Sequence, residues 1–264
     1  MSWIDRAVAR ENEILRIIKS FGKSKLEFIL VGGYAVSALA RQRFSVDCDV
    51  VIPKNLAKKF EELLRKEGYK VGQTKAGFDE AYGGEFASFR KKVGDLPVTI
   101  DLLIGSLVSR GTSASWSYQY IKENSVNATL ITGKESLEVS VPEKELLVAF
   151  KIHAGREADL RDIVMLTHGL DLGKVRKHTQ RGEMSKVREH IASELKSLNN
   201  PKVVLSLKGV YEIGGDTSES VSRAARLLEN LTKPRGGEVV GEKTHKEVIR
   251  ELDQLRRTGV DRRG

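Results

Sequence analysis

The chain has 264 residues, 40% of them hydrophobic, and its 45 Lys and Arg exceed its 36 Asp and Glu by nine, giving a formal charge of +9. This composition excludes a wholly disordered chain and supports one large domain or two modest ones. A single cysteine excludes an intrachain disulfide and a zinc finger, and the charge favours a polyanionic partner such as RNA, DNA or nucleotide.

The N-terminal segment is charged throughout and lacks the apolar core of a signal peptide. No apolar run approaches the roughly 20 residues that a membrane helix needs. We therefore expect a cytoplasmic protein without a membrane partner.

Residues 1–142 show a mixture of helix and strand periodicities. The predicted helices here are residues 2–20, 34–42, 55–68 and 115–127. The predicted strands are residues 26–31, 46–53, 69–71, 85–92, 97–105, 128–131 and 137–141. Residues 73–84 and 106–113 are predicted loops, and Gly94-Asp95 predicts a hairpin turn.

After Pro142 the pattern becomes wholly helical. The predicted helices are residues 143–154, 157–168, 172–181, 185–198, 201–207 and 218–231. The sequence therefore predicts an α+β protein, in which a mixed sheet flanked by helices is followed by a helical lobe. The expected units are residues 1–142, 143–232 and a basic tail, 233–264.

Two aspartates, Asp47 and Asp49, lie in one predicted strand, and a third, Asp101, lies in a later apolar strand. Side chains alternate along a strand, so Asp47 and Asp49 share one face while Cys48 points to the other. Taken singly, each acid is equally compatible with an exposed or edge position. Together they predict a site for Mg²⁺, with two ions expected and Mn²⁺ as an alternative, and Asp101 is also a candidate base.

Gly32-Gly33 follows a short buried strand and opens a helix. Such a turn exposes backbone N–H groups and the positive end of the helix dipole, both suited to phosphate. An ordinary tight turn is the alternative interpretation. Arg43 and Ser45, just before the aspartate pair, are candidate contacts for phosphate and for metal-bound oxygens.

The order of these features resembles the signature of the nucleotidyltransferase superfamily related to DNA polymerase β, in the segment VGGYAVSALARQRFSVDCDVVI followed by Asp101. The segment from Arg43 to Asp49 is similar, more specifically, to the AbiEii-like toxin-type nucleotidyltransferases. That group has a second motif, which Lys151, Arg156, Asp159 and Asp162 match here, whereas Ala158 replaces a lysine. The resemblance covers roughly residues 28–170. It implies a nucleotidyltransferase-type sheet and the use of an NTP.

The second motif has a physical interpretation of its own. Asp159 and Asp162 are three residues apart and share a helix face, and Lys151 is a candidate contact for a nucleotide phosphate. Alternatively, Arg156, Asp159 and Asp162 form a structural network of ion pairs between the two lobes.

Residues 170–210 contain nine Lys and Arg and four Asp and Glu. The densest group is a candidate RNA-binding face, although a solvated helix surface is equally compatible with it. Its members are Lys174, Arg176, Lys177, Arg181, Lys186 and Arg188.

These features favour an enzyme that moves a nucleoside monophosphate from an NTP to a hydroxyl, with RNA as the preferred acceptor. By resemblance to the toxin enzymes, the expected acceptor is a tRNA 3′ end and the expected partner an antitoxin. The alternatives are a non-catalytic RNA- or protein-binding module, nucleotidylation of a protein or small molecule, and a metal-dependent phosphohydrolase. The oligomeric state is left open.

Overall fold

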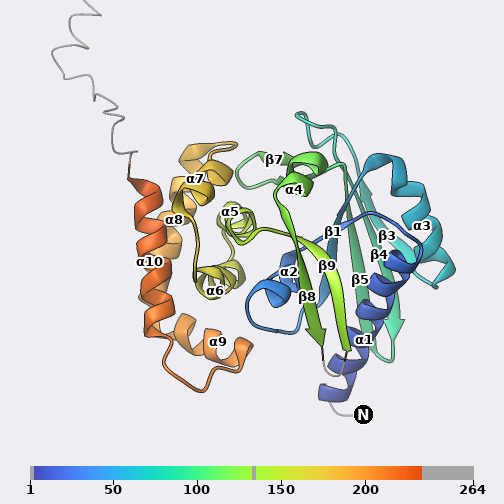
Figure 1. Cartoon of the computed structure of the whole chain (residues 1–264), viewed down its shortest axis with the longest axis horizontal. Helices are drawn as coiled ribbons and strands as arrows, with labels where there is room; N and C mark the ends of the chain where they lie inside the picture. The colour runs from blue at the N-terminus through green and yellow to red at the C-terminus, as the bar shows by residue number, and fades with distance from the viewer. Residues whose placement is uncertain (1–2, 133–134, 234–264) are drawn as a thin grey trace, which may run out of the picture.

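The structure, a computed structural model, describes residues 3–132 and 135–233 and has an α+β fold (Figure 1). A mixed sheet with its helices forms the first part, and every described element after Pro142 is a helix. This confirms the predicted fold class. The division into units 1–142, 143–232 and 233–264 stays a prediction, and residues 234–264 of the predicted basic tail lie outside the described residues.

Five strands form the central sheet in the order β1-β2-β5-β4-β3. β2 and β5 run parallel, and the other neighbouring pairs are antiparallel. A two-residue turn that begins with Gly94, at φ +59°, joins β4 to β5, as predicted. The strands are β1 (Ile29–Val31), β2 (Asp47–Ile52), β3 (Lys70–Lys75), β4 (Glu85–Val93) and β5 (Leu96–Ile104).

One face of this sheet is covered by α1 (Trp3–Lys23) and α3 (Ala57–Lys66), the latter preceded by the 3₁₀ turn η1 (Lys54–Leu56). The apolar spacing of α1 predicts this, because Ile14, Ile17, Ile18 and Phe21 recur on one helix face and are at most 1% exposed. The rings of Phe21 and Phe60 meet edge to face, with centroids 4.8 Å apart, and join the two helices.

The other side of the sheet carries α2 (Gly32–Leu39) and two hairpins. One hairpin pairs β6 (Ser106–Ser109) with β7 (Ala114–Ser117), which leads into α4 (Tyr118–Glu123). The other pairs β8 (Ser125–Thr132) with β9 (Glu135–Pro142) and packs against β1 and α2.

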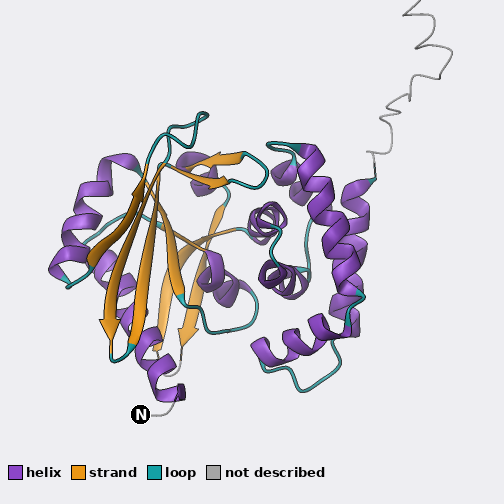
Figure 2. Ribbon diagram, turned by 180° about the vertical axis from the view of Figure 1, so that it is seen from behind, coloured by secondary structure: helices purple, strands orange, loops and turns teal. Residues whose placement is uncertain are grey.

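The helical part packs beside α2, with α5 and α6 lying between the sheet part and the outer helices (Figures 1 and 2). Gly155, at φ +63°, ends α5 in the left-handed conformation common at helix C-termini. No helix within the described residues is both long and apolar enough to cross a membrane. The helices are α5 (Lys144–Ala154), α6 (Glu157–Leu166), α7 (Leu172–Thr179), α8 (Met184–Leu198), α9 (Pro201–Tyr211) and α10 (Ser218–Thr232).

The two parts share one continuous hydrophobic core. Trp116 of β7 packs edge to face on Phe150 of α5, with ring centroids 4.8 Å apart. At the opposite end, the Arg41 guanidinium donates to the Glu212 carbonyl at 3.0 Å. These contacts hold α5 and the end of α9 against the sheet part.

Three local predictions were wrong. Residues 106–109, predicted as loop, form β6, and the predicted helix 115–127 is split into β7, α4 and the start of β8. The apolar residues that indicated a helix include Trp116, which faces Leu107 across the β6–β7 pair. Its burial against α5 is a tertiary contact, and such contacts override local periodicity. Residues 73–75 likewise extend β3 rather than belonging to a loop.

Candidate functional site

Three aspartates lie side by side on one face of the sheet, where β2 and β5 run parallel. The register pairs Asp49 with Asp101, and Asp47 lies two residues before Asp49 on the same face. Cys48 points to the opposite face and is fully buried. Strand register alone therefore brings together the three carboxylates selected from the sequence.

The glycine turn brings the first turn of α2 against this group. Gly32 has a φ of +65°, which residues with side chains rarely adopt, and a Cβ atom there would overlap Asp49 Oδ2. A Cβ at Gly33 would overlap Ser45 Oγ and lie 3.0 Å from Arg43 Nη2. Both glycines therefore permit a close approach that places the positive end of the α2 dipole beside Asp49.

Neighbouring carboxylates disfavour the charged forms of Asp49 and Asp101. Burial, followed by the charges of Asp101 and Asp47, raises the pKa of Asp49 to about 6. Burial also raises the pKa of Asp101, against the effect of the Ser88 hydroxyl. Asp101 Oδ1 is buried and has no hydrogen-bond partner among the described residues. A bound cation would relieve this unfavourable arrangement.

The donor set fits a divalent cation that is completed by other ligands. Within the described residues, no three His, Cys, Asp or Glu side chains close a metal site by themselves. Mg²⁺ does not require a closed set, because it keeps several waters and is held by one or two carboxylates with substrate phosphates. Asp47, Asp49 and the unpartnered Asp101 supply the hard oxygen donors that such a site needs.

A cavity of about 410 Å³ opens beside Asp49, between the sheet and α5. Its volume lies in the range of ordinary ligand sites. Gly32 and Asp49 form one wall, and Leu103, Leu107 and Phe150 contribute apolar surface. Its cationic residues are Arg110, Lys151 and Arg156. Such a lining suits an anionic ligand that also has an apolar or aromatic portion.

Lys151 lines this cavity, but its ammonium group is held by two aspartates of α6. Lys151 Nζ lies 2.8 Å from Asp159 Oδ1 and 2.6 Å from Asp162 Oδ2, and all three side chains are buried. Arg156 Nε also donates to Asp159, at 2.6 Å, while 73% of the Arg156 side chain remains exposed. Of these two cations, Arg156 is the one accessible to a ligand in the cavity.

Asp162 joins the two parts of the chain. Its carboxylate accepts hydrogen bonds from Arg43 Nε at 2.9 Å, Arg43 Nη2 at 2.8 Å and the Tyr211 hydroxyl at 2.6 Å. Burial opposes its charge, but Lys151 and Arg43 outweigh burial and hold the pKa of Asp162 below its ordinary value. The Arg43 guanidinium therefore points toward α6. Ser45, by contrast, stays beside the aspartates, where its Oγ donates to the Asp47 carbonyl at 3.2 Å.

The predicted RNA-binding cations of α7 and α8 are largely engaged within the fold. Lys174 and Lys186 each pair with a glutamate, Arg176 donates to two carbonyls at the end of α10, and Arg181 lies over two aromatic rings. Lys177 and Arg188 are exposed. The six side chains do not form one free surface.

Several residues of the site were missed in the sequence. Ser88 and Arg90 could have been found from the sequence, because the Gly94-Asp95 turn fixes the register of the hairpin. This register pairs Ser88 with Asp101 and places Arg90 on the same face. Tyr211 and Arg110 have no such signal, because they reach the site through tertiary packing.

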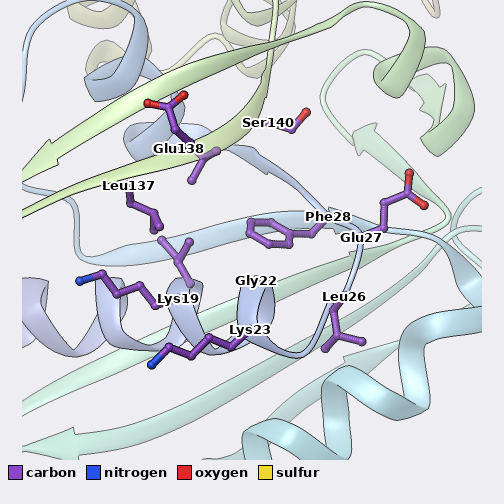
Figure 3. A pocket seen from close by; sticks show the side chains of 11 residues that line it. Lys19, Gly22, Lys23, Leu26, Glu27, Phe28, Leu137, Glu138 and Ser140 are labelled. Atoms are coloured by element: carbon purple, nitrogen blue, oxygen red, sulfur yellow. The ribbon is translucent and has the colours of Figure 1, made fainter.

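A larger cavity, of about 550 Å³, lies away from the aspartates, between α1 and β9 (Figure 3). Figure 3 shows Lys19 and Lys23 on α1 and Glu138 on β9 around it. Glu138 is hydrogen-bonded by Thr129. Because this cavity lacks a set of catalytic or metal-ligating groups, its size does not make it the candidate site.

No protein-family model and no curated protein matches the chain. Among solved structures, it is similar to an H. pylori protein provisionally described as a nucleotidyltransferase, with 16% identity, a TM-score of 0.46 and coverage of 88% of this chain and 96% of that one. It is also similar to the lincosamide antibiotic adenylyltransferase LnuA bound to lincomycin, with 20% identity, a TM-score of 0.42 and coverage of 60% and 96%. A third is ANT(2″)-Ia in complex with adenylyl-2″-tobramycin, with 17% identity, a TM-score of 0.34 and coverage of 76% and 95%. Because these identities and TM-scores are low, the chemistry of this chain has to be derived from its own residues.

Proposed function

We propose that the protein is a Mg²⁺-dependent nucleotidyltransferase that moves a nucleoside monophosphate from an NTP to a hydroxyl group. The observation that carries this proposal is the position of Asp49. It belongs to the row of strand carboxylates and also to the wall of the 410 Å³ cavity. A triphosphate in the cavity and a cation on the carboxylates would therefore be neighbours.

The residues around the cavity have complementary roles in this proposal. The Gly32 turn and the start of α2 receive phosphate oxygens, and Arg156 offsets phosphate charge from the opposite wall, with Lys151 behind it. Asp47 and Asp49 would hold Mg²⁺, and Asp101 would supply a further ligand if a second ion binds. When bound, Mg²⁺ or Mn²⁺ polarises the phosphate oxygens and stabilises the charge that develops on the leaving group.

Asp101 is the proposed base. Its Oδ1 has no hydrogen-bond partner in the described residues, so this oxygen is free to accept a proton. The acceptor hydroxyl gives its proton to Asp101 while its oxygen forms a bond to the α-phosphorus. The bond from the α-phosphorus to the β-phosphate oxygen breaks, so the monophosphate stays on the acceptor and pyrophosphate leaves.

RNA is the acceptor that we propose, because the charge of +9 favours a polyanionic partner. A tRNA 3′ end and an antitoxin partner are the finer predictions that follow from the sequence resemblance. Transfer to a protein or small molecule, and a binding module without activity, are the competing functions that the experiment must separate.

The test is incubation of the protein with Mg²⁺, total RNA and each α-labelled NTP in turn. We expect label on a defined RNA and release of pyrophosphate. Asp49→Asn and Asp101→Asn should each lower the rate about 10³-fold or more, because each removes charge stabilisation worth several kcal/mol. Asp95→Asn, in the exposed β4–β5 turn, is the matched control.

Unchanged transfer in the two site variants would refute the proposal. Label on the protein itself would indicate self-modification, and release of inorganic phosphate would indicate a phosphohydrolase. Binding of Mg-NTP without turnover would favour a module that keeps the fold but not the activity.

A further inference from the structure

Three cations lie on the sheet beside the aspartates, on the part of the face that continues across β4 and β3. The register pairs Lys70 of β3 with Arg90 of β4, and Arg90 with Thr99 of β5, which in turn pairs with Asp47. Lys92 lies two residues beyond Arg90 and therefore shares the same face. We call Lys70, Arg90 and Lys92 the cationic strip.

Side-chain contacts agree with this assignment of faces. Lys91, between two members of the strip, points to the opposite face, where its Nζ lies 3.0 Å from Glu13 Oε1 of α1. Arg90 lies close enough to Asp101 to act on its carboxylate electrostatically. Gly72, in a bulge of β3, makes room for Arg90, because a Cβ there would lie 3.3 Å from Arg90 Nε.

The strip is open, and its cations form no ion pairs within the described residues, although Arg90 acts on Asp101 electrostatically. Lys70, Arg90 and Lys92 are exposed, and none of them forms an ion pair with another residue of the ranges 3–132 and 135–233. α1, the helix that packs on β4 and β5, lies on the other face. Apart from the site aspartates, the nearest acid along this hairpin is Asp95, in the turn that follows Lys92.

The strip and the cavity lie on opposite sides of the aspartates. The cavity is bounded by the end of β1, the start of α2, β6 with the turn after it, and α5, and it reaches Leu103 near the end of β5. The strip instead extends across β4 to the sheet edge at β3. Phosphoryl transfer places the attacking and leaving oxygens roughly in line on opposite sides of the phosphorus. With the pyrophosphate in the cavity, the attacking hydroxyl arrives from the side of the strip.

The shape of the strip indicates an extended polyanion. Arg90 and Lys92 are about 7 Å apart along β4, and Lys70 is about 5 Å away across the strand pair, by ordinary strand geometry. Cations spread over a flat surface in this way suit successive phosphates of a backbone better than a single compact anion. The same charge would repel a cationic small-molecule acceptor.

We propose that the cationic strip binds the phosphate backbone of a single-stranded nucleic-acid acceptor and directs its terminal ribose hydroxyl to Asp101. This inference rests on the proposed nucleotidyl transfer for its orientation, but the surface itself can be tested by binding alone. It moves the acceptor surface from α7 and α8, where the sequence placed it, to β3 and β4.

The test compares three variants in fluorescence anisotropy with single-stranded RNA and DNA oligonucleotides of the same sequence, about 12 nucleotides long to cover one binding surface. The strip variant is Lys70→Gln/Arg90→Gln/Lys92→Gln. Its matched control is Lys58→Gln/Lys59→Gln/Lys66→Gln, which removes the same charge from exposed positions of α3 on the opposite face. A third variant, Lys177→Gln/Arg188→Gln, tests the competing surface of α7 and α8.

We expect the strip variant to lose at least about tenfold in affinity and about two units of the slope of log K against log salt, from three lost phosphate contacts at about 0.7 each. The α3 control should bind as the wild type does. Equal affinity for RNA and DNA would assign recognition to the phosphates, and stronger binding of RNA would add a contact to the 2′-hydroxyl; both support the strip.

Titration with Mg-NTP separates this inference from the proposed function. In the transfer reaction, the strip variant should show a raised KM for the acceptor. Lys70→Gln/Lys92→Gln, which leaves Arg90 beside Asp101, should in addition keep the wild-type affinity for NTP. If the wild type binds RNA through the strip but transfers no nucleotide, the proposed function fails and the surface stands. The inference is overturned if the strip and α3 variants bind alike, if only the α7–α8 variant loses affinity, or if the wild type binds neither oligonucleotide.

Discussion

The aspartates of the sheet and those of α6 differ in what surrounds their carboxylates. Asp49 and Asp101 lie side by side with Asp47 on one face of the sheet. Asp101 Oδ1 has no hydrogen-bond partner in the described part of the chain. Asp162, by contrast, accepts hydrogen bonds from Arg43 and Tyr211 and pairs with Lys151. The pKa of Asp49 is raised by burial and by its acidic neighbours, whereas that of Asp162 is held low by cations that outweigh burial.

This difference separates two uses of the same side chain. The α6 carboxylates are compensated within the fold, so their contribution is to hold the loop before β2 and the end of α9 against α6. Within the described residues, none of the strand carboxylates forms an ion pair, and Arg90, Lys151 and Arg156 offset their charge only in part. Such an arrangement is costly unless a ligand supplies the missing charge. Carboxylates with raised pKa values in a cleft are the better candidates for reactive groups. We therefore assign the catalytic role to the strand aspartates and a structural role to the aspartates of α6.

The largest effect on stability should come from Asp162→Asn. The substitution keeps the shape of the side chain but leaves the charges of Arg43 and Lys151 without their shared partner. Breaking a buried ion pair from one side costs about 3–5 kcal/mol. Chemical denaturation should therefore show a loss of this size in the free energy of unfolding.

The matched control is Asp101→Asn, which also replaces a carboxylate by its amide, here one that is partly buried. Because the Asp101 charge is opposed by its surroundings, we expect no loss of stability, although transfer activity falls. Equal destabilisation by the two variants would show that the strand and helix groups do not differ in the way described above.

Glu194 on α8 extends the comparison to a carboxylate that forms neither an ion pair nor a hydrogen bond within the described residues. It is 4% exposed, and neither of its carboxyl oxygens has a hydrogen-bond partner among the described residues. Burial, with a smaller effect of the Asp159 charge, raises the pKa of Glu194 from 4.5 to about 9. The folded protein therefore keeps this proton at neutral pH.

The unfolded chain releases the same proton above pH 4.5, so the free energy of unfolding should fall as the pH rises from 4.5 to about 9. The slope that Glu194 contributes is at most about 1.4 kcal/mol per pH unit. In Glu194→Gln this slope should disappear, whereas Glu189→Gln, exposed on the same helix, should keep it. Urea denaturation of both variants at several pH values measures the difference, and parallel curves for Glu194→Gln and wild type would contradict it.

The grouping of the strand aspartates could be predicted from the sequence, because it depends on side-chain alternation and turn geometry within short segments. Alternation of side chains places Asp47 and Asp49 on one face, and the Gly94-Asp95 turn fixes the β4–β5 register. The conformation required at Gly32 also follows from its place between a strand and a helix.

For the aspartates of α6, the sequence predicted only two alternatives: contacts to a nucleotide or a structural network of ion pairs. The sequence shows that Asp159 and Asp162 share a helix face, but not which cation meets them. Arg43 lies 119 residues before Asp162, and Tyr211 lies 49 residues after it. Pairings of this kind are set by the packing of whole elements, and the same holds for Arg176 and Arg181, whose partners keep them from forming a free basic face.

The smallest of these effects concerns the pH dependence of transfer, which should follow Asp49. Its pKa of about 6 means that acid protonates a proposed metal ligand within an accessible range, so the initial rate should fall about tenfold per unit below pH 6. A higher Mg²⁺ concentration should move this fall to lower pH, because metal and proton compete for the same carboxylate. Asp162, with its lowered pKa, stays ionised at pH 5, and the protein should remain folded while activity is lost. Initial rates between pH 5 and 8 at two Mg²⁺ concentrations, with circular dichroism alongside, measure both; a profile insensitive to Mg²⁺ would place the titrating group outside the metal site.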